Sequence, residues 1–156
     1  MNLNDIFVFK ARQAKSIEKV MDIRWSGYKK YQLERNSIED IYDHQENCTL
    51  LLAEDSTGNA IGTIRVMNRI KGRIELDDFL DLDNILNETE IYCAEASRLS
   101  VPQGPKSKEV KLALWKAYHR YCLAHQITTM VIAARPGASR DYQKLLFKKV
   151  GGGGTI

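Results

Sequence analysis

Hydrophobic and polar residues repeat along the chain with two periods, one typical of helices and one typical of strands. Apolar residues three or four positions apart predict helices, and the two longest cover residues 13–31 and 107–125. A segment rich in β-branched residues, 127–134, favours a buried strand. The expected strands cover residues 6–9, 49–53, 60–67, 90–101 and 127–134. The expected shorter helices or turns cover residues 37–43, 77–86 and 139–150.

Two connections indicate how these strands are arranged. Residues 55–59 join two strands and contain Gly58 and Asn59, which tolerate the positive φ of a tight hairpin. The helix over residues 107–125 lies between two strands, an order typical of a parallel crossover. The pattern therefore predicts a mixed α/β fold. Four glycines end the last helix, so we expect one domain over residues 1–150 and a flexible glycine-rich tail over residues 151–156.

The composition excludes several classes of protein. The 156 residues are 44% hydrophobic and 28% charged, which is typical of globular domains and not of collagen-like, coiled-coil or disordered chains. The longest apolar run, residues 130–134, is far shorter than the ~20 residues of a membrane span. Asp5 interrupts the region where a signal peptide needs apolar residues, so we expect a cytoplasmic protein. Three cysteines without a CxxC pair argue against a disulfide framework, and we expect no metal.

The charge is distributed unevenly between the two parts of the chain. Residues 1–105 hold 13 Lys and Arg against 18 Asp and Glu, a net charge of −5. Residues 106–156 hold 10 against 2, a net charge of +8. One interpretation is two solvated surfaces; the other is that the basic part contacts an anionic partner, such as a phosphate-bearing cofactor or an acidic protein. The basic part lacks interleaved aromatic residues and a known motif, so we do not expect nucleic acid as the partner.

Five charged residues stand out from the pattern, and most of them have both a structural and a functional interpretation. Arg24 lies on the apolar stripe of the first helix, where it either reaches a surface carboxylate or belongs to a site. Glu95 lies within an expected strand, where it is either one half of a buried ion pair or a desolvated general base. Arg98 falls on the opposite face of that strand unless a bulge turns it. Asp40 and Asp43 share one face of a helical turn and either cap it or bind a ligand.

These residues match, in order and spacing, the motifs of one enzyme group. The motifs are Arg24 with Tyr28, Asp40-Ile-Tyr-Asp43, Gly62-Thr-Ile-Arg65, Glu95-Ala-Ser97-Arg98-Leu-Ser-Val101 and Tyr142-Gln-Lys-Leu-Leu-Phe147. The fourth resembles an E-x-S-R-x-x-V strand and the last resembles a Y-x-K-L-G-F ending. The chain thus resembles, over residues 6–150, the acyl-homoserine lactone (autoinducer) synthases and the N-acyl amino acid synthases, which are branches of the GNAT N-acyltransferases.

The resemblance implies a fold, a reaction and roles for particular residues. The fold would be a mixed, mostly antiparallel central sheet flanked by helices, and the reaction would move an acyl group from acyl carrier protein, or from acyl-CoA, to a small amine or amino acid. Glu95 would act as general base and Tyr142 as general acid toward the leaving thiolate, with oxyanion donors near Leu99 and Val101. The residues implied to bind the acceptor are Arg24, Tyr28, Asp40, Asp43, Arg65, Ser97 and Arg98. The residues implied to bind the acyl-phosphopantetheine donor are Leu99, Val101, Gln103, Gly104, Lys106 and Ser107.

The sequence departs from the GNAT pattern at three places. The turn Pro102-Gln-Gly-Pro-Lys-Ser107 contains prolines, which lack N–H groups for a pyrophosphate cradle. Acyl carrier protein presents phosphopantetheine without that pyrophosphate, so this loss favours a carrier-protein donor. Leu146 replaces a glycine, and relatives continue with two more strands past the position of Ile156, so we expect the sheet to lack its last strands.

Alternatives to this interpretation stay open. They are an acetyl-CoA-dependent GNAT acetyltransferase and a non-catalytic binding protein with the same fold. A covalent route through Cys48, Cys93 or Cys122 is disfavoured, because GNAT transfer is usually direct. Two further predictions concern the sheet and the donor. The strand ending at Val101 should splay from the strand near Ile127, and carrier protein should dock on Lys106, Lys108, Lys111, Arg140, Lys144, Lys148 and Lys149.

Overall fold

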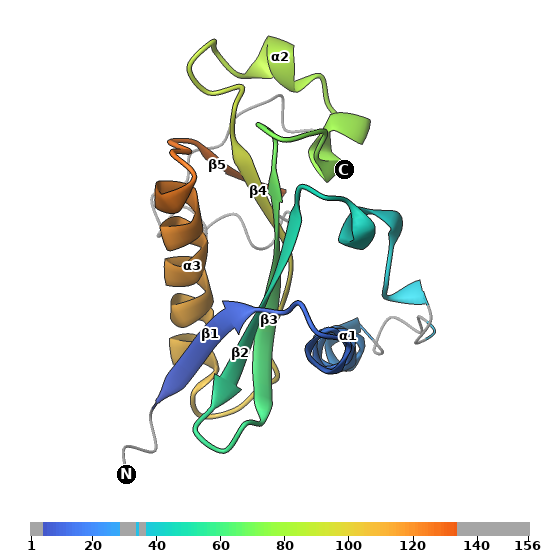
Figure 1. The fold of residues 1–156 in the computed structure, drawn as a ribbon, viewed down its shortest axis with the longest axis vertical. Coiled ribbons are helices and arrows are strands. Elements are labelled where there is room, and N and C mark those ends of the chain that lie inside the picture. Colours follow the sequence, from blue (N-terminus) through green and yellow to red (C-terminus); the bar gives the residue numbers. More distant parts are fainter. Residues whose placement is uncertain (1–4, 29–33, 35–36, 134–156) are drawn as a thin grey trace.

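The computed structural model describes residues 5–28, 34 and 37–133, which form one sheet covered by helices on both faces (Figure 1). The strands lie side by side in the order β1 (Ile6–Lys10), β2 (Cys48–Asp55), β3 (Ala60–Asn68), β4 (Ala94–Ser100) and β5 (Met130–Ile132). Neighbouring strands are antiparallel except for β4 and β5, which are parallel. The predicted mixed, mostly antiparallel sheet flanked by helices is therefore confirmed. No helix within the described ranges is long and apolar enough to cross a membrane.

One face of the sheet packs against helix α3 (Ser107–Ala124). Successive side chains of β3 point to opposite faces, and Ile64 and Val66 are the ones that join the buried cluster with α3. Gly62 lies in the same row and lets the helix come close, because a Cβ there would stand 2.8 Å from the Cγ1 of Val110. This apolar layer fixes the position of β3 and β4 beneath the helix.

The opposite face carries helix α1 (Ala14–Tyr28) and three short helices, η3 (Ile41–His44), η4 (Glu75–Asp78) and α2 (Leu82–Ile85) (Figure 1). One apolar cluster joins α1 to β2, and a second joins η4 and α2 to the ends of β3, β4 and β5. Arg65 and Met67 of β3 point to this face, as their cross-strand partners Ser97 and Glu95 do. The polar residues of the sheet are therefore gathered between the two apolar clusters.

The hairpin has the predicted form, whereas the ends of the elements differ from the predicted ones. The β2–β3 turn is the predicted tight one: the Asp55 Oδ1 accepts hydrogen bonds from the N–H groups of Thr57 and Asn59, and Gly58 has φ 84°. The strand expected over residues 90–101 is shorter at both ends, because residues 87–90 form a turn held by the Asn87 side chain, and Pro102 lacks an N–H group. The expected helix over residues 139–150 and the tail over residues 151–156 lie outside the described residues.

The structure describes the pairing of β4 and β5 at one end. Residues Ala94 to Ala96 pair with Met130 to Ile132, whereas the rest of β4 pairs only with β3 in the part of the chain that the structure describes. The residues that would continue β5 beside the second half of β4, from position 134 onward, lie outside the described residues. The splay between these two strands therefore stays a prediction.

Candidate active site

Three arginines and three carboxylates from five elements meet on the face of the sheet that carries α1. Each residue is placed by a different part of the chain, so the cluster forms only when these parts pack together. Its members are Arg24 of α1, Asp40 and Asp43 of the η3 turn, Arg65 of β3, Glu75 of η4 and Arg98 of β4. Five of the six match the charged residues singled out in the sequence, and the charges balance.

Arg24 forms the most deeply buried pair of the cluster. Its two terminal nitrogens donate to the two carboxylate oxygens of Asp43, each at 2.8 Å, and the side chains are 0% and 1% exposed. The alternative in which Arg24 reaches a surface carboxylate is therefore wrong. The Nε of Arg24 is buried and has no hydrogen-bond partner among the described residues. A bidentate pair of this kind fixes both the position and the orientation of the two side chains.

Arg65 links the cluster to the sheet. Its guanidinium donates to Asp40 at 2.6 Å, to Asp43 at 3.1 Å and to Glu75 at 3.2 Å, and its Nε donates to the hydroxyl of Ser97 at 3.1 Å. Burial opposes the charge, but the three carboxylates outweigh it and raise the pKa of Arg65. Arg65 is thus a permanent cation that orders three acids and one neighbouring strand.

A bulge in β4 brings Arg98 to the same face. Strict alternation would place Arg98 opposite Ser97, but Arg98 has φ 54° and the register with β3 shifts there. Its guanidinium reaches Glu75 at 2.9 Å and Asp40 at 3.2 Å, and it is 32% exposed. Arg98 is therefore the arginine of the cluster nearest to solvent.

Asp40 and Asp43 cap the η3 turn, which is the structural role considered from the sequence. Asp40 caps η3 by accepting from the N–H groups of Tyr42 and Asp43, and Asp43 accepts from the N–H of Asp40 at 2.9 Å. The same carboxylates bind Arg24 and Arg65. Burial alone would raise the pKa of Asp43, but the hydrogen bond and charge of Arg24 lower it to about 2. The cap thus also anchors the arginines of the cluster.

Glu95 lies beside this cluster but outside its ion pairs. Its side chain is buried, at 1% exposed, and its Oε1 accepts a hydrogen bond from the Leu76 N–H at 3.2 Å. No ion pair to Glu95 occurs within the described ranges, so the buried Glu–Arg pair considered from the sequence is not found. Burial raises the pKa of Glu95 to about 7, against the opposing effects of the Leu76 N–H, Arg65 and Arg98. A carboxylate with this pKa can accept and release a proton near neutral pH.

The residues expected to bind the donor lie around the turn from β4 to α3. Leu99 and Val101 are half-buried and pack against the cluster under α3, while Gln103 and Gly104 are exposed. Lys106 precedes the first turn of α3, and the Ser107 N–H donates to the Gly104 carbonyl at 3.2 Å. This turn is mostly exposed and connects the end of β4 to the start of α3.

Two expected site residues lie away from the charges. Tyr28, at the end of α1, packs against the apolar cluster between α1 and β2. Tyr142 lies outside the described residues. The three cysteines are kept as thiols, because burial raises the pKa of Cys93 to about 11 and those of Cys48 and Cys122 to about 12. In the described part of the chain, no cluster of three His, Cys, Asp or Glu residues could hold a metal ion.

Glu75 is the member of the cluster that the sequence did not reveal. It bonds both Arg65 and Arg98 and thereby closes the ring of charges. The sequence pattern predicts a helix or turn over residues 77–86, which leaves Glu75 outside it. The available signal was the pair Glu75-Leu76, in which a charge precedes an apolar residue at the start of an acidic turn.

Comparisons with known proteins agree with this geometry. A family model described as N-acyl amino acid synthase FeeM matches residues 23–155. The structure of FeeM, an N-acyl amino acid synthase from uncultured soil microbes, superposes with a TM-score of 0.67 at 13% identity, covering 88% of this chain and 76% of that chain. The search of curated proteins found no match.

Two acetyltransferases show the same fold. The aminoglycoside 6'-N-acetyltransferase AAC(6')-Ih from Acinetobacter baumannii has a TM-score of 0.68 at 12% identity, covering 97% of each chain. A predicted acetyltransferase from Clostridium acetobutylicum, solved with acetyl-CoA, has a TM-score of 0.65 at 11% identity, covering 93% of this chain and 91% of that chain. The fold is thus that of the GNAT acetyltransferases.

Proposed function

Because the chain belongs to the FeeM family of N-acyl amino acid synthases and is an N-acyltransferase, we propose that it moves an acyl chain from acyl carrier protein to the amine of an amino acid. The donor is an acyl-phosphopantetheine thioester, and the product is an N-acyl amino acid with a free carboxylate. The proposal extends to the cytoplasm as the place of the reaction.

The observation that carries this proposal is the state of Glu95. Its buried carboxylate has a pKa near 7 and stands on β4, in the part of that strand that pairs with β5. An amine attacks a thioester only after losing its proton, and a base with a pKa near the working pH is the most effective acceptor. Glu95 takes this proton, directly or through a water, while N–H groups near Leu99 and Val101 stabilise the oxyanion and Tyr142 protonates the leaving thiolate.

The charged cluster positions the acceptor. Asp43 is 1% exposed and both of its oxygens are engaged by arginines and by the η3 cap, so Asp43 orders the site instead of touching substrate. Arg98 and Asp40 are the members of the cluster with the most accessible side chains, 32% and 25% exposed. We assign the acceptor carboxylate to Arg98 and its ammonium to Asp40, with Arg24, Arg65 and Ser97 ordering the cluster around these two.

The turn before α3 supports a carrier protein as donor. GNAT enzymes that use CoA need backbone N–H groups for its pyrophosphate, whereas Pro102 and Pro105 supply none. Exposed Lys108 and Lys111 follow on the first turns of α3 and offer a basic surface to an acidic carrier. The acetyl-CoA bound by the Clostridium acetobutylicum neighbour makes acyl-CoA the competing donor.

Mass spectrometry of reaction mixtures tests the proposal. The purified protein is incubated with acyl carrier protein or with CoA, each loaded with the same acyl chain, and with a panel of amino acids and simple amines. We expect an N-acyl amino acid, formed faster from the carrier protein. Product formed from acyl-CoA alone would show that acyl-CoA is the donor in place of acyl carrier protein. The absence of any acylated amine across the panel would contradict the proposal.

A further inference from the structure

A short, irregular segment covers Glu95. Between the end of β3 and the start of β4 the chain folds back over the sheet, and its only helices are η4 and α2, of four residues each. Apolar side chains of this cover pack on the sheet at Met67, Cys93 and Val131, next to Glu95. The Leu76 N–H that bonds Glu95 belongs to the same segment. The dry environment of Glu95 therefore depends on how firmly this cover is held.

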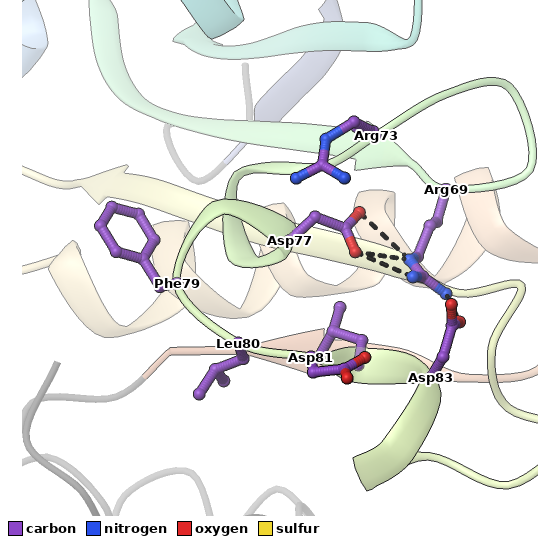
Figure 2. Close-up of a pocket in the computed structure, with 8 residues that line it drawn as sticks. Arg69, Arg73, Asp77, Phe79, Leu80, Asp81 and Asp83 are labelled. Atoms are coloured by element: carbon purple, nitrogen blue, oxygen red, sulfur yellow. Dashed lines mark hydrogen bonds and ion pairs between the residues drawn. The ribbon is translucent and has the colours of Figure 1, made fainter.

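One guanidinium joins the separate parts of the cover. Arg69 directly follows β3, and its Nε and one terminal nitrogen donate to the carboxylate of Asp77 in η4 at 2.8–3.1 Å (Figure 2). The other terminal nitrogen donates to Asp83 of α2 at 3.1 Å and to the backbone carbonyl of Ile91 at 2.7 Å. The Arg69 N–H also donates to the Cys93 carbonyl at 2.9 Å. Arg69 thus ties η4, α2 and the entry to β4 to the end of β3.

The contact of Arg69 with Asp77 is shielded from water, whereas its contact with Asp83 is open to solvent. The Arg69 and Asp77 side chains are 15% and 7% exposed, although they border a polar pocket of about 350 Å³, and the Asp83 side chain is 69% exposed. Hydrogen bonds to Asp77 raise the pKa of Arg69, and Asp77 in turn accepts from the Ile74 N–H at 3.0 Å to begin η4. A shielded pair of this geometry holds its partners more firmly than a surface pair does.

The same pocket contains a natural control. Arg73 also bonds η4, at Asp78, but its side chain is 70% exposed. Among the described residues, this side chain makes no hydrogen bond or ion pair to α2 or β4. Figure 2 shows Arg73 on the wall of the pocket, with Arg69 and Asp77 directly paired. Replacing either arginine removes one positive charge from this region. A difference between the Arg69 and Arg73 variants therefore reports on the contacts that Arg69 alone makes with α2 and the entry to β4.

We propose that Arg69 is a positioning residue for acyl transfer: it holds the cover formed by residues 74–91 closed over Glu95 and keeps water from that carboxylate. The inference rests on the proposed function, in which Glu95 is the base. Arg69 touches neither Glu95 nor the cluster of arginines and carboxylates, and it acts through Asp77, Asp83 and the Ile91 carbonyl.

The groups around Glu95 determine whether its pKa rises or falls when Arg69 is replaced. Burial is the largest influence and raises its pKa; Glu75 raises it further, and the Leu76 N–H, Arg65 and Arg98 lower it. Cys93, just before β4, and Tyr118 on α3 are neutral near pH 7, since burial raises both of their pKa values. A loosened cover admits water and lowers the pKa of Glu95, whereas loss of the Arg69 charge alone would raise it.

The test compares Arg69→Gln, Arg69→Lys and the control Arg73→Gln. The pKa of the Glu95 carboxyl is measured by carbon-13 NMR in the free enzyme, and kcat is measured against pH. We expect both Arg69 variants to lower the Glu95 pKa by at least about one unit and kcat about tenfold or more, with the acceptor KM little changed. The lysine variant keeps the charge but has a single amino group for three acceptors. Arg73→Gln should match the parent.

An unchanged Glu95 pKa in both Arg69 variants would overturn the inference, as would a raised pKa in Arg69→Gln with a normal Arg69→Lys. If the Arg69 variants do not fold, Asp83→Asn releases α2 alone and should lower the pKa by a smaller amount; no change would again overturn it. The NMR measurement uses the free enzyme, so it stands even if Glu95→Gln keeps its activity. That last result would remove the proposed base and leave the role of Arg69 in covering Glu95 intact.

Discussion

Glu95 carries a conflict between stability and chemistry. A carboxylate in water would be ionised well below pH 7, but burial makes ionisation of Glu95 unfavourable in the folded chain. The folded state therefore holds this proton more tightly than the unfolded state does. Stability falls as the pH rises from the unfolded value of about 4.5 through the folded value of about 7. The proposed base therefore lowers the stability of the folded chain above neutral pH.

Replacement of Glu95 by glutamine should reveal this conflict. Glutamine keeps the oxygen that accepts from the Leu76 N–H and has no charge to bury. We expect Glu95→Gln to raise the free energy of unfolding by roughly 3 kcal/mol at pH 8 and to change it little at pH 4. Urea unfolding at the two pH values measures this. Equal stability of the two proteins at pH 8 would show that Glu95 is not desolvated.

Arg24 makes the opposite contribution. Its removal leaves the buried carboxylate of Asp43 without its bidentate partner, and breaking a buried pair typically costs about 3–5 kcal/mol. We expect Arg24→Met to lower the free energy of unfolding by this amount. Arg73→Met breaks an exposed pair with Asp78 and should change the free energy of unfolding far less. Similar losses in both variants, measured by urea unfolding, would argue against a tightly held cluster.

Among the secondary-structure elements, β3 and β4 do most to position the site. Their alternation separates an apolar face under α3 from a polar face under α1, and the bulge at Arg98 adds a further polar side chain to that face. The close approach of α3 at Gly62 holds β3 against the helix.

Gly62 offers a test of this packing. A Cβ there would meet Val110 at 2.8 Å and Leu114 at 3.1 Å, so α3 must shift to accept it. We expect Gly62→Ala to lower the free energy of unfolding by about 1–3 kcal/mol, as overpacking commonly does. Gly104→Ala is the control, because nothing lies within 4 Å of its Cβ position. Thermal unfolding of both variants measures this difference. A Gly62→Ala variant as stable as the parent would mean that α3 is packed more loosely against β3.

The elements were easier to predict than the site. Periodicity located every described strand and both long helices, because amphipathic spacing reflects burial directly. It could not place Glu75 or the start of β4 at Ala94, since turns and side-chain bonds in residues 87–91 decide these. Arg24 and Glu95 stood out as charges at apolar positions, and the resemblance implied Arg65. The side-chain contacts of Arg69 join residues up to 22 apart in the sequence, and no local pattern records them.

The whole molecule presents a basic surface along α3. Lys108, Lys111, Lys116 and Arg120 are exposed on this helix, and Glu109 is its single acid. Lys108 and Lys111 lie at the end next to the turn from β4, and Lys116 lies about 12 Å further along the helix axis from Lys108. A carrier protein that delivers its thioester to the predicted splay would contact the first pair. The other expected docking residues, Arg140, Lys144, Lys148 and Lys149, lie outside the described residues.

Reversing the charge at the two ends of α3 tests this docking. We expect Lys108→Glu with Lys111→Glu to raise the KM for acyl carrier protein about tenfold at low salt, and less at high salt, because such pairs are screened. Lys116→Glu with Arg120→Glu is the matched control and should change it less. The KM for a short acyl-pantetheine should stay constant in both. An unchanged carrier-protein KM in the first variant would favour acyl-CoA as donor.

The rate of acyl transfer by Glu95→Gln tests the central claim most directly. The variant keeps the shape of the side chain and the bond to Leu76 but cannot accept a proton. With acyl carrier protein as donor and the preferred amino acid as acceptor, we expect kcat to fall about 10²–10⁴-fold while the donor KM stays constant. Glu88→Gln, at an exposed position of the same sign, should match the parent. A loss of less than about tenfold with donor binding intact would contradict the assignment of Glu95 as the base.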